Sequence, residues 1–103
     1  MTSIPDITLN DGRTIPQLGF GTYQIPPGTT AQAVTAALEA GYRHIDTAEM
    51  YDNEAGVGEA VRASSLDRAD VFVTSKLSNA YHRPDDGRRE FDRTLEALQS
   101  DYV

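Results

Sequence analysis

The 103-residue chain has the composition of one ordinary globular domain, with 39% hydrophobic and 24% charged residues. It has no long apolar run, no basic-then-apolar N-terminus and no cysteine, which argues against a membrane-spanning helix, a secretory signal and a disulfide framework. Nine basic against sixteen acidic residues give a net charge of −7, so no basic face is expected for nucleic acid or an anionic membrane. We expect a cytoplasmic protein.

The first predicted element is a β-hairpin. Two short β-prone segments, Ile7–Leu9 and Thr14–Ile15, flank the tripeptide Asn10-Asp11-Gly12. An Asp-Gly pair supplies the positive-φ residues that a tight turn between antiparallel strands needs.

Three strand-and-helix units follow the hairpin. Each begins with a short apolar run that ends in polar residues, and the three runs are Leu18–Gly21, Arg43–Asp46 and Val71–Lys76. A stretch of helical period follows each run, which predicts βαβ units and a parallel sheet. A fourth strand is predicted to begin at 101–103.

The helix limits are predicted from capping residues. Thr29 or Thr30 is expected to cap a first helix that stops at Gly41, and Asp52 or Asn53 to cap a second. The third is expected to begin near Pro84 and Asp85, with an apolar stripe of Phe91, Leu95 and Leu98. No linker interrupts residues 1–103, and because three to four units cannot close a barrel, we expect a larger domain of which this chain is a part.

The glycines of the LGFGTYQ segment raise the possibility of a dinucleotide-binding turn. Gly19 and Gly21 begin a G-x-G-x-x-G pattern, but Gln24 stands at the third glycine and two prolines follow. A helix N-terminus that could hold a pyrophosphate is therefore not expected there. Close backbone packing at a strand end explains these glycines better.

Asp46 and Lys76 each end a predicted strand. Parallel strand ends share one edge of the sheet, where α/β enzymes keep their active sites, so the two side chains can meet there. Lys76 is the only lysine among nine cations, and a lysine offers a compact, tunable amine. A structural ion pair or a helix cap remains the alternative for Asp46.

Tyr51 follows Asp46 by five positions, in the next loop. Near Lys76 it could act as a proton donor, since a neighbouring cation favours the phenolate form; packing is the alternative role. His44 lies on the same side of its strand as Asp46, but the only other histidine, His82, lies in a loop, so no metal site is predicted.

The string GYRHIDTAEMYDNEAGVG, residues 41–58, resembles the first signature of the aldo-keto reductases. The positions that fall on the signature are Gly41, Arg43, Asp46, Ala48, Glu54 and Gly58. The hairpin, the LGFGTY run and the VFVTSK strand resemble the same family in order and spacing, and SKLSNAYHRPDD resembles its prokaryotic, diketogulonate-reductase-like branch.

This resemblance implies an eight-stranded β/α (TIM) barrel, of which the chain would supply the N-terminal hairpin and the first three to four units. It also implies reduction of small aldehydes and ketones with NADPH, NADH not being excluded, by a monomeric protein. The family's catalytic Asp, Tyr and Lys carry over to Asp46, Tyr51 and Lys76, and the tetrad's histidine would lie beyond Val103.

The resemblance also implies a cofactor and substrate surface. Gly21, Thr22, Tyr23 and Asp46 would lie near the nicotinamide, and Tyr23 would line the substrate pocket. Ser78 stands where many relatives have tryptophan, so the pocket shape does not carry over. Two other classes stay open: a non-catalytic binding subunit, which would not need the Asp, Tyr and Lys, and a metal hydrolase barrel, which would need more histidines.

Overall fold

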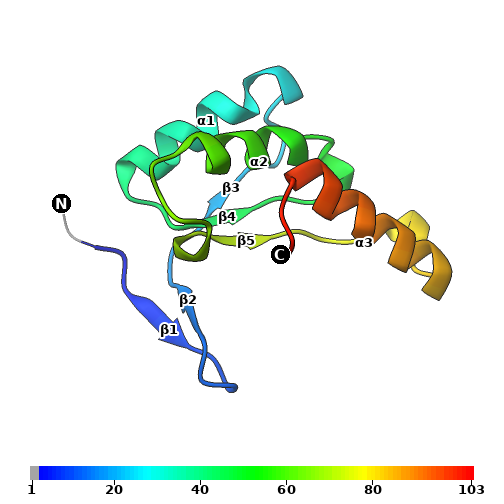
Figure 1. Ribbon diagram of the computed structural model, residues 1–103, viewed down its shortest axis with the longest axis horizontal. Coiled ribbons are helices and arrows are strands. Elements are labelled where there is room, and N and C mark those ends of the chain that lie inside the picture. The colour runs from blue at the N-terminus through cyan, green and yellow to red at the C-terminus, as the bar shows by residue number, and fades with distance from the viewer. Residues whose placement is uncertain (1–2) are drawn as a thin grey trace.

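The computed structural model describes residues 3–103, which form a hairpin, a parallel sheet and three helices (Figure 1). The strands are β1 (Asp6–Thr8), β2 (Thr14–Pro16), β3 (Phe20–Gly21), β4 (His44–Asp46) and β5 (Phe72–Thr74). The helices are α1 (Pro27–Ala40), α2 (Glu54–Ala63) and α3 (Pro84–Leu98), with three short 3₁₀ helices, η1 (Glu49–Tyr51), η2 (Arg68–Asp70) and η3 (Asn79–Tyr81). None of the helices in residues 3–103 has the length and apolar character needed to cross a membrane.

The sheet has the order β3-β4-β5 and is parallel throughout, which confirms the predicted strand–helix repeat. Gly21 pairs with Asp46, and Asp46 pairs with Thr74, so the three strands end in line. All three helices cover the same face of this sheet (Figure 1).

Alternation along the strands separates an apolar face from a polar one. Ile45 in β4 and Val73 in β5 are buried beneath the helices, while the residues on either side of each are only half-buried. The core between sheet and helices is largely aliphatic: Val34, Leu38, Ile45, Val57, Ala60, Val61, Val71, Val73 and Leu98. The opposite face carries His44, Asp46 and Thr74.

The hairpin forms where the sequence predicts it, with Ile7 opposite Ile15. Only Gly12 of the Asp-Gly pair has a positive φ, +87°, while the Asp11 carboxylate accepts a hydrogen bond from the backbone N–H of Arg13 at 3.0 Å. The turn thus needs one left-handed residue instead of two.

The start of α3 at Pro84 and the N-cap position of Asn53 before α2 agree with the prediction, but the predicted cap of the first helix is wrong. Helix α1 begins at Pro27, earlier than expected, and no side chain caps it; the Thr30 hydroxyl donates instead to the carbonyl of Pro26 at 2.9 Å. Proline has a preset helical φ, and the N–H that it lacks is one that the start of a helix leaves without a partner, so it is well suited to begin a helix. Gly41, with φ +111°, ends α1 as predicted.

Two other expectations fail near the C-terminal end. In α3 the buried residues are Glu90, Thr94 and Leu98, whereas Phe91 is exposed, so the face turned to α2 is partly polar. Residues 101–103 form no strand. The Arg68 guanidinium contacts this segment instead. It donates a hydrogen bond to the Tyr102 carbonyl oxygen at 2.9 Å and lies 4.1 Å from the centre of the Tyr102 ring.

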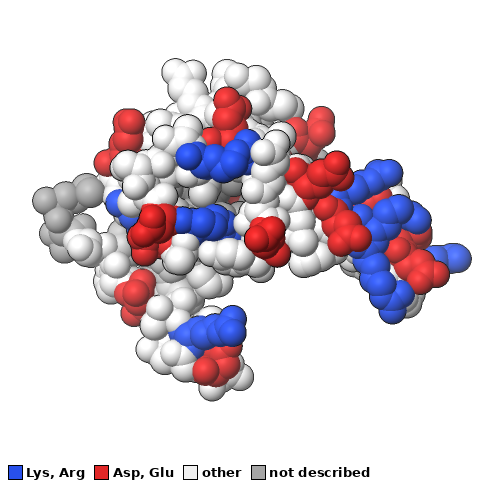
Figure 2. Space-filling view, in the orientation of Figure 1, with Lys and Arg blue, Asp and Glu red and all other residues white. Residues whose placement is uncertain are grey.

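Acidic and basic residues are interspersed along α3. Arg88 pairs with Asp85 at 2.9 Å, and Arg89 pairs with Asp86. On the face shown in Figure 2, blue and red side chains intermingle at this end of the molecule and form no continuous basic surface.

Candidate active site

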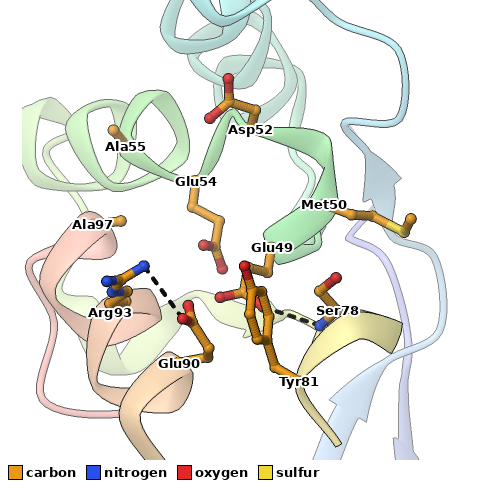
Figure 3. Close-up of a pocket in the computed structure, with 10 residues that line it drawn as sticks. All are labelled: Glu49, Met50, Asp52, Glu54, Ala55, Ser78, Tyr81, Glu90, Arg93 and Ala97. Carbon is orange, nitrogen blue, oxygen red and sulfur yellow. Dashed lines mark hydrogen bonds and ion pairs between the residues drawn. The ribbon is translucent and has the colours of Figure 1, made fainter. Parts of the chain in front are cut away.

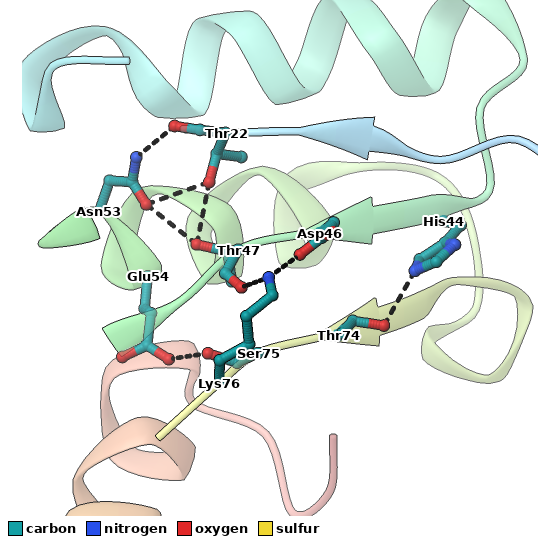
Figure 4. Close-up of polar contacts among 9 residues, drawn as sticks. All are labelled: Thr22, His44, Asp46, Thr47, Asn53, Glu54, Thr74, Ser75 and Lys76. Atoms are coloured by element: carbon teal, nitrogen blue, oxygen red, sulfur yellow. Dashed lines mark hydrogen bonds and ion pairs between the residues drawn. The ribbon is translucent and has the colours of Figure 1, made fainter. Parts of the chain in front are cut away.

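The ends of β4 and β5 bring Asp46 and Lys76 together, as their strand positions predict (Figure 4). The Lys76 ammonium donates to the Asp46 carboxylate and, at 2.9 Å, to the carbonyl oxygen of Thr47. Both side chains are close to half exposed, at 49% and 44%. An ion pair so exposed contributes little to folding stability, so its main effect is to hold the amine in place.

Tyr51 lies beside this pair, on η1. The Lys76 nitrogen is 5.4 Å from the centre of the Tyr51 ring. The centres of the Tyr23 and Tyr51 rings are 5.3 Å apart, and their planes are tilted by 56°. The carboxylate, the ammonium and the phenol that the sequence singled out therefore share one edge of the sheet.

The residues expected near a nicotinamide differ in accessibility. Gly21 ends β3 with open space where a side chain would lie, and the Tyr23 side chain is 66% exposed. Thr22 is fully buried, and its hydroxyl oxygen lies 2.9 Å from that of Thr47. The groups at this edge that a nicotinamide ring could contact are therefore the Gly21 backbone and the Tyr23 ring.

Asn53 joins the loops after β3 and β4, a role that the sequence did not reveal. Its carbonyl oxygen accepts hydrogen bonds from the Thr22 and Thr47 hydroxyls at 3.2 and 2.9 Å, and its amide donates to the carbonyl of Thr22 (Figure 4). The same amide also donates to the carbonyl of Ile25. Asn53 does precede α2, but its side chain makes no capping bond. The sequence feature that could have indicated this role is a threonine just after each of two strands, together with an asparagine before the next helix.

His44 lies on the same face of β4 as Asp46 but bonds elsewhere. Its Nε2 lies 2.9 Å from the Thr74 hydroxyl, and its ring meets the Phe72 ring edge-on at 5.2 Å. Burial lowers the pKa of His44 from 6.5, and the charge of Lys76 acts in the same direction, while Asp46 and the Pro16 backbone oppose it. Within residues 3–103 no three His, Asp or Glu side chains converge as metal ligands.

An acidic cavity of about 410 Å³ lies between η1, α2, η3 and α3 (Figure 3). Glu54 is tied down there by Ser75, whose hydroxyl donates at 2.6 Å, and by Thr94 at 3.3 Å. The pKa of Glu90 is raised, first by a hydrogen bond with Glu49 and then by burial, against the charges of Arg93 and Arg89. The ten residues that line it are Glu49, Met50, Asp52, Glu54, Ala55, Ser78, Tyr81, Glu90, Arg93 and Ala97.

Comparison with known proteins places this geometry in a family. Residues 17–103 match the model of the Aldo/keto reductase family. The chain belongs to the aldo/keto reductases. An aldo/keto reductase from Brucella melitensis has 48% sequence identity and a TM-score of 0.96 over the whole chain, which covers 39% of that structure.

Two further relatives support the assignment to the aldo/keto reductases. The Bombyx mori aldo-keto reductase, solved in complex with NADP, is 37% identical with a TM-score of 0.89, over all of this chain and 37% of that one. The D/L-glyceraldehyde reductase of Hypocrea jecorina is 44% identical over all of this chain and 33% of its own length. The chain spans about a third of the length of the curated relatives that it matches. Its hairpin and three strand–helix units are thus units of the aldo/keto reductase TIM barrel.

Several signature residues of this aldo/keto reductase chain are structural. Arg43 donates to the carbonyls of Leu38 and Tyr42 at 2.9 and 2.7 Å, and so closes the end of α1. At Gly58, a β-carbon would lie 2.7 Å from the carbonyl carbon of Leu98, and closer still to its oxygen. The glycine lets α2 and α3 approach at backbone contact.

Proposed function

We propose that this chain carries the proton-donating half of an active site that reduces small aldehydes and ketones with a nicotinamide cofactor. The observation that carries the proposal is the position of Lys76, which bonds Asp46 and lies beside the Tyr51 ring. Membership of the aldo/keto reductases supports carbonyl reduction.

The cofactor is proposed to be NADPH, with NADH as the second possibility, and it would supply a hydride to the carbonyl carbon. The exposed Tyr23 ring beside the uncovered Gly21 backbone suits contact with a flat nicotinamide ring. The Bombyx mori relative was solved with NADP, which supports a nicotinamide cofactor. Tyr23 would also line the substrate side of the site.

In the proposed mechanism Tyr51 gives its hydroxyl proton to the oxygen of the reacting carbonyl as charge develops on it. The Lys76 ammonium then stabilises the phenolate that remains, and Asp46 holds that ammonium in place beside the tyrosine. General-acid help of this kind contributes about 10²–10⁴-fold to a rate. The retention of all three groups disfavours a purely binding role.

The test uses a completed barrel, in which this chain replaces the part of the Brucella melitensis aldo/keto reductase that it covers. We expect this hybrid to oxidise NADPH in the presence of glyceraldehyde, the compound named for the Hypocrea jecorina relative. The unaltered Brucella protein is the control. A hybrid that melts cooperatively and binds NADPH, yet reduces neither glyceraldehyde nor the control's own substrate, would overturn the proposal.

A further inference from the structure

The short helix η1, which carries Tyr51, has little support of its own. It spans three residues, and its own backbone bonds run from Tyr51 to Ala48 at 3.1 Å and from Asp52 to Glu49 at 3.2 Å. A single 3₁₀ turn has poor hydrogen-bond geometry and seldom persists by itself. Contacts from outside must therefore set where the Tyr51 ring lies.

Glu49, the first residue of η1, makes two such contacts. Its backbone N–H donates to the carbonyl of Lys76 at 3.1 Å, and its side-chain Oε1 accepts from the backbone N–H of Ser78 at 3.0 Å (Figure 3). The two bonds lie on either side of Leu77, so Glu49 links η1 to the backbone of residues 76–78 at two points. Among the residues of η1 described in the structure, Glu49 alone uses its side chain to accept a hydrogen bond from the backbone of residues 76–78.

Glu49 faces the acidic cavity that α3 also lines. Glu90 is only 3% exposed and lines the same cavity, close to the Glu49 carboxylate (Figure 3). Arg93 lies 3.2 Å from Glu90 on the other side, while Arg89 also faces Glu90, and Glu54 and Asp52 line the same cavity. The fifteen-residue helix α3 thus contributes charged side chains of both signs to the cavity that Glu49 lines.

We propose that Glu49 is a positioning residue for Tyr51: its backbone N–H and its carboxylate fix η1 against the segment after Lys76 and so set the distance between phenol and ammonium. The inference rests on the proposed function, because it assigns Glu49 a part in orienting that proton donor. Glu49 touches neither the ammonium nor the phenol through its side chain, so it acts only through the placement of these groups.

The test compares variants of the completed barrel. Glu49→Ala removes the acceptor of the Ser78 N–H, and we expect kcat to fall about 10-fold while KM and the Kd for NADPH stay nearly constant, since misplacing a reacting group by a fraction of an ångström is costly. Glu49→Gln keeps that acceptor and should restore most of kcat. Glu59→Ala, at an exposed position on α2, is the matched control for loss of a carboxylate.

A second variant attacks the same bond from its other end. Ser78 has φ −61°, which proline can adopt, so Ser78→Pro removes the N–H without straining that residue. Its reference is Ser78→Ala, which loses the hydroxyl but keeps the N–H. We expect Ser78→Pro to show the same fall in kcat relative to Ser78→Ala, and the Glu49→Ala/Ser78→Pro double variant to show no further fall.

The outcomes separate the two proposals. If Tyr51→Phe is inactive while Glu49→Ala and Ser78→Pro match their controls, the positioning role is wrong and the proposed function stands. If Tyr51→Phe stays active, the proposed function is wrong, and the positioning role that rests on it is wrong with it. Should Glu49→Ala lose its cooperative melt, the comparison of Ser78→Pro with Ser78→Ala decides alone.

Discussion

Lys76 and Asp46 stand 30 positions apart in the chain, yet their side chains form an ion pair at the ends of neighbouring strands. The parallel register makes this possible, because Asp46 pairs with Thr74 and Lys76 follows two residues later. The pair is close to half exposed, and the tilted rings of Tyr51 and Tyr23 lie at the same edge of the sheet. Chemistry at this edge depends on the orientation of the amine more than on the strength of the ion pair.

Removing the Tyr51 hydroxyl tests the proton donor. In the completed barrel, Tyr51→Phe is expected to reduce turnover by at least ~10²-fold and leave NADPH binding unchanged, because only the donated proton is lost. Tyr42→Phe, which retains the edge contact of that ring with Phe20 at 5.8 Å, is the matched control. Steady-state kinetics and fluorescence titration give the two values, and more than roughly a tenth of the original turnover in Tyr51→Phe would contradict the assignment.

Replacing the amine tests the electrostatic support. Lys76→Met removes the charge beside the Tyr51 ring and leaves Asp46 without its partner, so we expect turnover to fall by about 10²-fold or more. Lys76→Arg restores a charge but not the compact ammonium that reaches both Asp46 and the Thr47 carbonyl, and should recover only part of the rate. Equal rates for Lys76→Met and the parent would remove Lys76 from the mechanism.

Gly58→Ala tests the approach of α2 to α3. Alanine normally favours a helix over glycine by about 1 kcal/mol, but here its methyl group would collide with the Leu98 backbone. We expect the free energy of unfolding of the completed barrel to fall by about 2 kcal/mol or more.

Gly28→Ala, in α1, is the control for the glycine substitution, because no atom lies within 4 Å of its added β-carbon. Urea unfolding should show Gly28→Ala to be neutral or stabilising. Equal losses in the two variants would contradict the close approach at Gly58.

The lowered pKa of His44 predicts a loss of stability in mild acid. The unfolded chain takes up this proton near pH 6.5, before the folded chain does, so the stabilisation is complete above pH 6.5 and is lost as pH falls through the folded pKa. His44→Gln, which can still bond Thr74, should remove this part of the pH dependence. Urea unfolding from pH 8 to 5 measures it, and identical slopes for both proteins would show that His44 does not titrate differently on folding.

The 103-residue chain on its own is predicted to be inactive and poorly folded. Ordering a chain of this size costs roughly 100–200 kcal/mol of conformational entropy, and its sheet has helices on one face only. Large apolar side chains such as Leu18 and Met50 are exposed, at 52% and 66%. A sharp calorimetric melt from a monodisperse monomer in the ultracentrifuge would contradict the folding part, and NADPH-dependent turnover the rest.

Local sequence patterns were sufficient for the sheet and for the meeting of Asp46 and Lys76. Apolar runs that end in polar residues identify strands, and parallel strands place their ends together whatever the loops between them do. Tyr51 could be placed beside them because only four residues separate it from Asp46.

Tertiary partners decided what the sequence could not show. Asn53 is a good capping residue, but its side chain is engaged by Thr22, 31 positions away. Phe91 has the hydrophobicity of a core residue, yet α3 turns Glu90 inward, where the Arg93 guanidinium lies 3.2 Å from its carboxylate. Hydrophobic periodicity cannot anticipate such a polar contact.

The enclosure of Asn53 makes its side-chain amide a reporter of motion. Both carbonyl groups that accept hydrogen bonds from this amide lie in the segment after β3, while Asn53 itself directly precedes α2. These protons can exchange with solvent deuterium only when that segment and α2 separate. Their exchange rate therefore measures how often the sheet edge beside Tyr23 and Tyr51 opens, without any substitution in the site.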